Sequence, residues 1–296
     1  MLIIRARASQ FIIRALLKAG IFKYWTWSLV LRARRRFSQV TPPLELETTF
    51  DDDIRIVTLL SDHIESQVFW QGFQEADEGA IKLVKRNLPA DGVFIDIGAN
   101  IGTFTLVAAH QIPRGRVHAF EPSAYHFTRL ARNVELNRFD NVVLNQKGLY
   151  DQAGETVLFL PSRTGEMNNS GAASLYSLGE NTEVSEAISL IRLDDYVRDK
   201  NIERIDVIKI DIEGAEIKAL NGAKDSIIRL RPLVLMELDL DNLERAGCSA
   251  GEVLAFWTSL NYRVSIIKIT GETIPVTSAN EFGRHQNLEC RLLASL

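Results

Sequence analysis

Residues 94–104, FIDIGANIGTF, combine an apolar run, an acid and two closely spaced glycines. The pattern predicts a buried strand that ends in Asp96, a tight turn, and a helix that opens at Gly102. Glycines at such a turn allow positive φ angles, and the first N–H groups of the helix have no partner within it. We therefore expect a ligand at this turn. Asp96 is expected to direct its carboxylate into the pocket, where a fixed anion suits a cofactor that carries an amino group.

The glycine spacing distinguishes this turn from a dinucleotide site. Gly98 and Gly102 give the pattern G-x-x-x-G, whereas pyrophosphate-binding turns use G-x-G-x-x-G. An anion at Asp96 would also repel a pyrophosphate, which needs the same helix end. The alternative interpretation is a turn that only packs a helix on a strand.

A second acid follows the next predicted strand. Glu121 stands nineteen residues after Gly102 and precedes Pro122. An acidic side chain in this place can accept hydrogen bonds from both hydroxyls of a ribose. Together with Asp96 and the glycine turn, in this order, Glu121 predicts a ribose-containing ligand.

A third group of acids ends the apolar run IDVIKI, residues 205–210. Asp211 and Glu213 lie at the carboxyl end of this predicted strand, where ligands of open α/β sheets bind. They could act as a general base on a substrate hydroxyl, or hold a divalent cation that lowers the pKa of that hydroxyl. Lys209 is interpreted as a strand-edge charge, and Glu216 as an acid favoured at a helix start.

These residues lie in runs that resemble one known family. DIGANIGTF, AFEPS, LARNVELN, RLDDYV, IDVIKIDIEGAEIKALNGA and PLVLMEL are together similar to the FkbM family of S-adenosylmethionine-dependent methyltransferases. The resemblance covers residues 75–240 and is most specific at KIDIEGAE, residues 209–216. The segment before residue 75 lies outside it.

The resemblance implies a class I methyltransferase fold, which is Rossmann-like and has a seven-stranded sheet with an antiparallel last strand. It implies S-adenosylmethionine as the cofactor and O-methylation of hydroxyls on secondary metabolites or on glycan sugars. Carried onto this sequence, it places the methionine part of the cofactor among Asp96, Gly98, Asn100 and Gly102, and the ribose at Glu121. The full set of expected cofactor-binding residues is Asp96, Gly98, Asn100, Gly102, Thr103, Glu121 and Asp211, and the expected catalytic residues are Asp211 and Glu213.

Alternating strands and helices must position these residues. Such alternation predicts βαβ units and a doubly wound, mostly parallel sheet with helices on both faces. The final strands, 262–269 and 289–294, have no helix between them, which indicates a terminal antiparallel hairpin. The other predicted strands are 54–59, 93–97, 116–120, 141–146, 156–160, 205–210 and 233–237, and the helices are 78–88, 102–110, 124–137, 215–222 and 250–260.

A long polar stretch, residues 161–190, interrupts this order. It is rich in Ser, Asn and Gly, and a loop of this length in a compact domain is usually functional or disordered. We expect its segment 168–175 to lie over the cofactor pocket as a substrate lid.

The start of the chain is basic and amphipathic. Residues 1–40 contain nine of the 34 Lys and Arg and none of the 38 Asp and Glu. This composition is typical of helices at a membrane surface, although a helix packed on the main domain is the alternative. Arg14, Lys18 and Lys23 interrupt the apolar run 11–31, so a transmembrane anchor is not expected. The expected division is a basic extension and linker (1–44), a strand and helix cap (45–90) and the methyltransferase domain (91–296).

Composition also excludes several classes of function. An acidic body argues against a nucleic-acid substrate, and the resemblance implies a small-molecule or glycan acceptor. Cys248 and Cys290 suggest neither a disulfide nor a zinc site, and no histidine is assigned as a metal ligand. We expect a cytoplasmic protein, with peripheral membrane contact through residues 1–40 as the open alternative. The sequence leaves the oligomeric state open.

Two rival functions are weighed against the methyltransferase. An NAD(P)-dependent oxidoreductase shares the parallel sheet and the acid after its second strand, but the glycine spacing, Asp96 and the terminal hairpin disfavour it. A catalytically inactive binding protein of the same fold is disfavoured by the retained acids Asp96, Glu121, Asp211 and Glu213.

Overall fold

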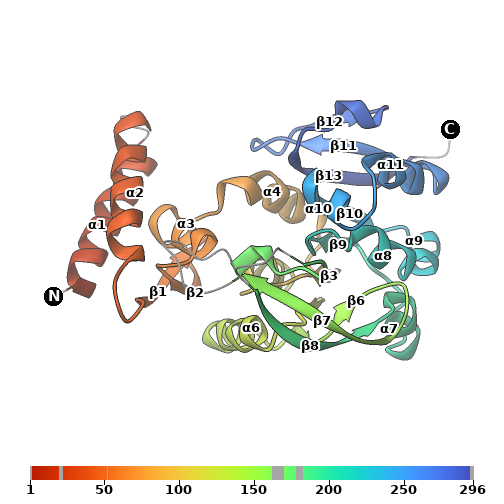
Figure 1. Ribbon diagram of the computed structural model, residues 1–296, viewed down its shortest axis with the longest axis horizontal. Helices are drawn as coiled ribbons and strands as arrows, with labels where there is room; N and C mark the ends of the chain where they lie inside the picture. The colour runs from red at the N-terminus through yellow and green to blue at the C-terminus, as the bar shows by residue number, and fades with distance from the viewer. Residues whose placement is uncertain (1, 20–22, 52, 162–169, 178–182, 294–296) are drawn as a thin grey trace. The chain divides into compact units, whose positions relative to one another are not determined.

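The computed structural model describes residues 2–19, 23–51, 53–161, 170–177 and 183–293. The chain forms two compact units, Met1–Glu75 with Pro161–Ala172, and Ala76–Leu160 with Ala173–Leu296 (Figure 1). This division differs from the expected boundaries after residues 44 and 90. Residues 45–75 cluster with the basic helices, and residues 76–90 cluster with the sheet.

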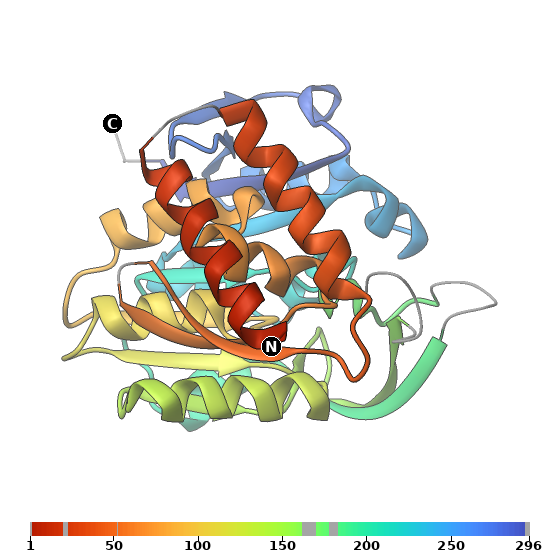
Figure 2. The ribbon, with the colours of Figure 1, turned by 90° about the vertical axis from the view of Figure 1, so that its left-hand side faces the viewer.

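The first unit packs three helices and a strand pair around its own core. The helices α1 and α2 run side by side (Figure 2), and the strands β1 and β2 pair antiparallel. Residues 45–74 were expected to hold one strand and a turn, but they contain β1, β2 and α3. The elements are α1 (Leu2–Lys18), α2 (Lys23–Ser38), β1 (Glu45–Phe50), β2 (Ile54–Leu59), α3 (His63–Gln71) and the 3-10 helix η2 (Ser170–Ala172).

Polar side chains of α1 hold this unit together. The Nε2 group of Gln10 donates to Thr48 Oγ1 at 2.6 Å and to the carbonyl of Phe69 at 2.8 Å. The guanidinium of Arg14 donates to the carbonyls of Val68 and Phe69 near the end of α3, and the Val68 carbonyl also accepts from the N–H of Gly72, the C-cap of that helix. The buried face of α1 is thereby fixed against β1 and α3.

The second unit is built on an eight-stranded sheet in the order β12-β11-β13-β10-β9-β3-β4-β5. Strands β10, β9, β3, β4 and β5 are parallel, so the mostly parallel α/β sheet is confirmed. The strands are β3 (Val93–Ile97), β4 (Arg116–Phe120), β5 (Val142–Asn145), β9 (Val207–Ile210), β10 (Leu233–Asp239), β11 (Tyr262–Ile267), β12 (Thr273–Val276) and β13 (His285–Leu292).

Helices cover both faces of this sheet. Successive residues of a strand point to opposite faces, so Phe94 and Val207 pack in one apolar cluster, and Ile95 and Ile208 in the other. The helices α4 and α5 contribute to the first cluster, and α7, α8, α9 and α11 to the second. The helices are α4 (Glu78–Asn87), α5 (Thr103–Gln111), α6 (Ala124–Asn137), α7 (Leu193–Asp199), α8 (Glu216–Asn221), α9 (Lys224–Leu230), α10 (Leu240–Arg245) and α11 (Ala250–Ser259), with the 3-10 helices η1 (Glu75–Asp77) and η3 (Ala279–Glu281).

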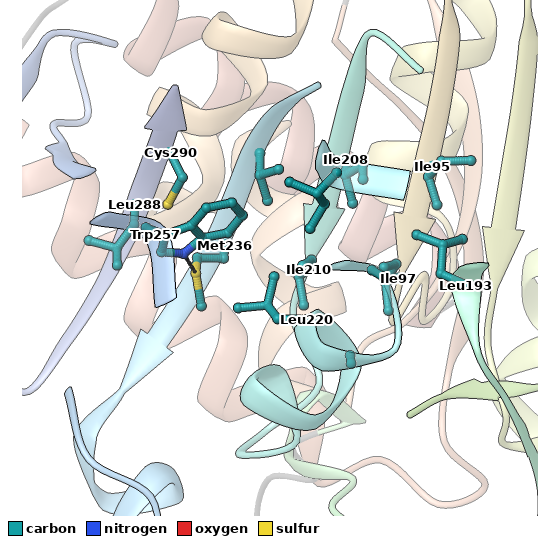
Figure 3. Close-up of a cluster of buried hydrophobic side chains, with 14 of the residues drawn as sticks. Ile95, Ile97, Leu193, Ile208, Ile210, Leu220, Met236, Trp257, Leu288 and Cys290 are labelled. Carbon is teal, nitrogen blue, oxygen red and sulfur yellow. Dashed lines mark hydrogen bonds between the residues drawn. The ribbon is translucent and has the colours of Figure 1, made fainter. Parts of the chain in front are cut away.

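Figure 3 shows the second cluster. The fully buried Trp257 of α11 lies beside Leu288 and Cys290 of β13, and its Nε1 group is 3.4 Å from the sulfur of Met236. Isoleucines of β9 and β3 continue the same cluster along the sheet. Burial of these large side chains fixes the register of β3, β9 and β10, and with it the relative positions of the strand ends.

The end of the sheet is antiparallel, as expected. Strand β13 lies between β10 and β11 and is antiparallel to both. The seven strands implied by the resemblance are therefore present, and β12 adds an eighth at the edge. Strand β13 begins at His285, four residues earlier than the predicted start at Glu289.

A smaller three-stranded sheet has the order β6-β8-β7. It corrects the prediction of one long loop over 161–190, because β8 occupies the end of that stretch and places its alternate side chains Ile188 and Leu190 in an apolar cluster. The strands are β6 (Gly148–Leu149), β7 (Gly154–Pro161) and β8 (Glu183–Ile191).

In the part of the chain that the structure describes, every helix is too short or too polar to cross a membrane.

Candidate active site

Four neighbouring strands bring the predicted site residues to one edge of the sheet. The strands β4, β3, β9 and β10 are consecutive and parallel. The turn 98–102 follows β3, Glu121 follows β4, and Asp211 and Glu213 follow β9. Because the carboxyl ends of parallel strands share an edge, residues far apart in the sequence meet there.

The glycine turn after β3 is a sharp left-handed bend. Gly98 has φ 78° and Gly102 has φ 101°, values that side chains disfavour. A Cβ atom on Gly98 would lie 1.9 Å from the carbonyl oxygen of Asp211, so only glycine lets the end of β9 approach. Gly102 is the N-cap of α5, and Thr103 is the first residue of that helix.

Asn100 stands at the centre of this turn with φ 50°. Its side-chain oxygen Oδ1 is buried and accepts no hydrogen bond from the described residues. A buried acceptor without a donor is costly, so this atom is suited to a donor supplied by a ligand.

Glu121 fastens the turn to the neighbouring strand. Its Oε2 accepts from the backbone N–H of Asn100 at 2.8 Å, and its Oε1 accepts from that of Ser123 at 3.0 Å. Burial raises the pKa of Glu121 to about 7, although these two bonds oppose the shift. Each carboxylate oxygen has a second lone pair, so Glu121 can still accept a hydrogen bond from a ligand hydroxyl.

Asp96 lies in β3, two residues before Gly98, and its Oδ1 is buried without a hydrogen-bond partner among the described residues. The side chain is completely buried, and its Oδ2 accepts from Thr105 Oγ1 at 2.5 Å. Burial raises the pKa of this carboxyl, against the effect of Lys209. One carboxylate oxygen thus bonds to the first turn of α5, and the expected role of Asp96 in the cofactor pocket stays a prediction.

Lys209 is more than a strand-edge charge. Its ammonium group is buried and donates to the carbonyl of Gly98 at 3.0 Å. It lies 3.0 Å from Asp211 Oδ2 and 3.9 Å from Asp96 Oδ1. Burial alone would lower the pKa of Lys209, but the charges of Asp211, Asp96 and Asp77 outweigh it and raise the pKa. Lys209 thus connects the glycine turn with the acids after β9.

Three carboxyl groups converge beside Lys209. One oxygen each of Asp211, Glu213 and Glu237 lies within 4.8 Å of the others. Burial and the negative charge of Asp211 raise the pKa of Glu213 to about 9. Burial would raise the pKa of Asp211, but Lys209 and a hydrogen bond from Glu237 lower it, so Asp211 is the member that stays ionised.

Glu213 is held in place from two sides. Its carboxylate accepts a hydrogen bond from the side-chain amide of Asn242, and its φ is 52°. Its backbone carbonyl accepts from Ser174 Oγ at 2.8 Å. Ser174 belongs to the segment expected to form a lid, and it also pairs with Phe159 of β7. Residues 168 and 169 of that segment lie outside the described part of the chain.

His285 is a site residue that sequence reasoning missed. Its Nε2 lies 2.9 Å from Glu237 Oε1 and its Nδ1 3.4 Å from Asp239 Oδ2. His285 pairs with Asp239 in the register of β10 and β13, so it stands at the same sheet edge as the acids. The available sequence indication was that an antiparallel last strand begins where its parallel neighbours end.

Asp77, at the N-terminus of α4, also escaped prediction. It is buried, and burial together with the charge of Asp211 raises its pKa to about 7. Glu216 starts α8, as the sequence indicated, and accepts from the backbone N–H groups of Gly214 and Ile212. Its helix-start interpretation therefore agrees with its contacts.

Comparison with known proteins adds to this geometry. The family model of the methyltransferase FkbM domain matches residues 96–264. This range contains the glycine turn, Glu121 and the acids Asp211, Glu213 and Glu237.

Three curated relatives are similar to the chain. Methyltransferase 1 of Beauveria bassiana is 32% identical over 167 residues, which are 51% of this chain and 66% of the relative. The 31-O-demethyl-FK506 methyltransferase FkbM of Streptomyces tacrolimicus is 33% identical over 195 residues, 56% of this chain and 70% of the relative. The hexuronic acid methyltransferase AglP of Haloferax volcanii is 28% identical over 211 residues, 71% and 78% of the two chains.

Proposed function

Because the chain belongs to the FkbM methyltransferase family, we propose that it is an S-adenosylmethionine-dependent methyltransferase whose acceptor is a hydroxyl oxygen of a sugar, a glycan or a secondary metabolite. The observation that carries the proposal is the contact between the glycine turn and the end of β9, which sets Asp211 directly beside Gly98. The names of two relatives, one acting on 31-O-demethyl-FK506 and one on a hexuronic acid, support an oxygen acceptor.

The residues of the turn fit the proposed cofactor. Asn100 offers a buried acceptor without a donor, which suits the amino group of the methionine part. Glu121 offers carboxylate lone pairs to the ribose hydroxyls, and Gly98 and Gly102 supply the positive φ angles that the turn requires. Lys209 and Asp96 are assigned positioning roles, because Lys209 donates to the carbonyl of Gly98 and Asp96 accepts from Thr105 in the first turn of α5. When bound, S-adenosylmethionine supplies a methyl group activated by its sulfonium.

The acids after β9 and β10 can accept the proton that the acceptor hydroxyl loses on methylation. Transfer of the methyl group to a neutral hydroxyl would break its bond to the sulfonium sulfur, leave the thioether S-adenosylhomocysteine, form the C–O bond of an ether and release one proton. Asp211, the ionised carboxylate, is assigned to orient the hydroxyl and to accept this proton. Glu237 shares a hydrogen bond with Asp211, and His285, about half exposed, contacts Glu237. The proton can therefore leave along Asp211, Glu237 and His285 to solvent.

A divalent cation is the second interpretation of the acid cluster. Burial and the negative charge of Asp211 raise the pKa of Glu213 to about 9, and a cation among Asp211, Glu213 and Glu237 would relieve the repulsion between these carboxylates. Titration of the cofactor-free chain with Mg²⁺ in a calorimeter tests this directly. Heat of binding that is lost in Glu213→Gln supports a cation, whereas equal activity with Mg²⁺ and with EDTA rejects it.

Calorimetry of the full chain tests the cofactor. S-adenosylmethionine and S-adenosylhomocysteine are expected to bind, and NADH is expected not to bind. Asn100→Ala and Glu121→Gln should each weaken S-adenosylmethionine about tenfold or more, because each removes a polar contact from a buried site. Glu135→Gln, at an exposed position of α6, is the matched control. Binding of NADH, or unchanged affinity in both variants, would overturn the assignment.

The acceptor class is tested with S-adenosylmethionine labelled in its methyl group. The label should appear as an O-methyl ether on hydroxyl-bearing sugars or metabolites, and Asp211→Asn should abolish the transfer while cofactor affinity changes little. Label transferred to nitrogen or carbon acceptors alone would contradict O-methylation.

A further inference from the structure

Helix α1 has two apolar faces, of which only one is packed. Its buried side chains Ala6 and Ile13 belong to the core of the first unit. On the opposite side of the helix, Ile4 is 73% exposed and Phe11 is 76% exposed. Ile12, next to Phe11, is 54% exposed. Positions 4, 8, 11 and 15 recur at helical spacing, so the exposed side chains form one stripe along α1.

This stripe is unusual for a helix on a protein surface. A surface helix normally has one apolar face, directed at the core, and a polar face directed at water. On α1 the face away from the core carries Ile4, Ala8, Phe11, Ile12 and Ala15. Large apolar patches that are rimmed by polar residues mark surfaces for partners or membranes.

Cations rim the stripe. Arg5 lies on one side of it on the helical projection, and Arg7 and Lys18 on the other, and all three are exposed. Residues 1–44 contain no Asp or Glu. Arg14 and Arg34 are excluded from this rim, because their guanidinium groups bond to α3. The surface therefore pairs exposed apolar side chains with an excess of positive charge.

A hollow adjoins the stripe between α1 and β1. Its volume is about 640 Å³, and its charged lining residues are Arg7, Arg14, Lys18 and Glu47. Glu47 is neutralised by Arg55, whose Nε lies 2.7 Å from its Oε1. The hollow therefore has a positive excess charge, which suits a phosphate-bearing headgroup beside inserted acyl chains.

Helix α2 also exposes an apolar side chain with basic residues around it. Leu31 is 58% exposed, and its neighbours Arg32, Arg35 and Arg36 are exposed as well. The helices α1 and α2 lie side by side (Figure 2), so the exposed residues of α2 are close to those of α1. Apolar residues with Lys and Arg around them are the composition of helices that lie in the plane of a membrane interface.

We propose that the exposed face of α1, together with the exposed residues of α2, binds the surface of an anionic phospholipid bilayer. The side chains of Ile4, Phe11 and Ile12 insert among the acyl chains, and Arg5, Arg7 and Lys18 contact lipid phosphates. The surface is complementary to an anionic bilayer, because acyl chains match its apolar side chains and negative headgroups match its cations. This binding extends the proposed function by bringing the acceptor hydroxyl to a membrane, but it does not depend on catalysis.

Vesicle sedimentation with the full chain tests the proposal. The chain should bind vesicles of equal parts phosphatidylglycerol and phosphatidylcholine, and bind phosphatidylcholine alone weakly. The double variant Ile4→Asn/Phe11→Asn should lose at least about tenfold in partition coefficient, because two inserted side chains are removed. Arg5→Gln and Lys18→Gln should each lose about fivefold on the anionic vesicles.

Two matched controls isolate the surface. Ile274→Asn alters an equally apolar side chain of β12 that is 49% exposed, and Lys224→Gln removes an exposed cation of α9. Both should bind like the parent chain. All the altered side chains are exposed, so melting temperatures should agree, and cofactor binding in the calorimeter should be unchanged. A failure of membrane binding is thus distinguishable from a failure of the proposed function.

Three outcomes would overturn the proposal. Equal binding to neutral and anionic vesicles would remove the role of the cations. Parent-like binding of Ile4→Asn/Phe11→Asn would remove the role of α1. A dimer in sedimentation equilibrium that this double variant dissociates would assign the stripe to a second copy of the chain.

Discussion

The ammonium group of Lys209 lies 3.0 Å from the carbonyl oxygen of Gly98. This contact joins the middle strand of the site, β9, to the glycine turn after β3. The same ammonium lies 3.0 Å from Asp211, so one buried cation connects the proposed cofactor turn with the proposed proton acceptor.

Replacing Lys209 by methionine tests this connection. The change leaves Asp96 and Asp211 without their common counter-charge in a buried place, which should lower the free energy of unfolding by about 3 kcal/mol. Cofactor affinity and kcat should fall together, because the turn and Asp211 lose the same partner. Urea unfolding and calorimetry measure both effects, and Lys209→Arg, which keeps the charge, should lose less of each. Parent-like stability in Lys209→Met would show that the ion pairs contribute nothing.

Gly98→Ala should be strongly destabilising. The new Cβ would lie 1.9 Å from the carbonyl oxygen of Asp211, and φ of 78° is unfavourable for alanine. Strand β9 or the turn must move, at a cost of about 2 kcal/mol or more, and S-adenosylmethionine binding should be lost with it. Gly154→Ala is the control, since nothing lies within 4 Å of a Cβ there. Thermal unfolding of both variants decides, and equal melting temperatures would contradict the close approach.

The stability of the cofactor-free protein should fall as the pH rises through the acids of the site. Burial raises the pKa of Glu121 and of Glu216 from 4.5 to about 7 in the folded chain. A raised folded pKa means that the stabilisation is complete below pH 4.5 and is lost as the pH passes about 7. The pKa of Asp211 is lowered, so its contribution to the free energy of unfolding changes only below pH 3.8, outside this interval.

Urea unfolding at a series of pH values measures this slope. Glu216→Gln removes one of the titrations in this interval, to which the raised pKa values of Asp77 and Glu213 also contribute, and should reduce the slope between pH 4.5 and about 7. A free energy of unfolding that increases across this interval would show that both carboxyls are ionised at little cost.

Glu237→Gln and His285→Ala test the proton path. Each breaks the chain of contacts behind Asp211, so kcat should fall about tenfold or more while the KM for the cofactor stays near that of the parent. Added imidazole should restore part of the activity of His285→Ala but none of Glu237→Gln. His110→Gln, an exposed position of α5, is the matched control. Unchanged kcat in both site variants would assign these residues to packing alone.

The central strands were predictable because they are buried on both faces. VFIDI and VIKI are short apolar runs between turn residues, and β3 has the predicted bounds Val93–Ile97. The acids that follow such runs must lie at the ligand edge, so Glu121, Asp211 and Glu213 could be placed from spacing alone. The hydrogen-bond partner of Asp96 could not be predicted, because the alternation of residues along a strand does not show which group a buried carboxylate contacts.

The first unit was harder to predict. Strand β1, ELETTF, buries Leu46, Thr48 and Phe50, and the threonine hides the apolar alternation. Helix α3 is defined by its cap, since Asp62 accepts from the N–H groups of Ile64 and Glu65, and its side chains are buried on most sides. His285 was missed because β13 begins with the polar residues His285, Gln286 and Asn287, which give no strand pattern.

The position of β13 also has a consequence for biosynthesis. This strand lies inside the sheet, between β10 and β11, although it follows both in the sequence. On the ribosome, β11 and β12 must therefore leave the exit tunnel before the strand that joins them to β10 exists. Until residues 285–292 have been translated, β10 exposes an unpaired edge that can recruit other chains. We expect the nascent chain to need protection by chaperones during this interval, and the sheet to close only after its interior strand has been made.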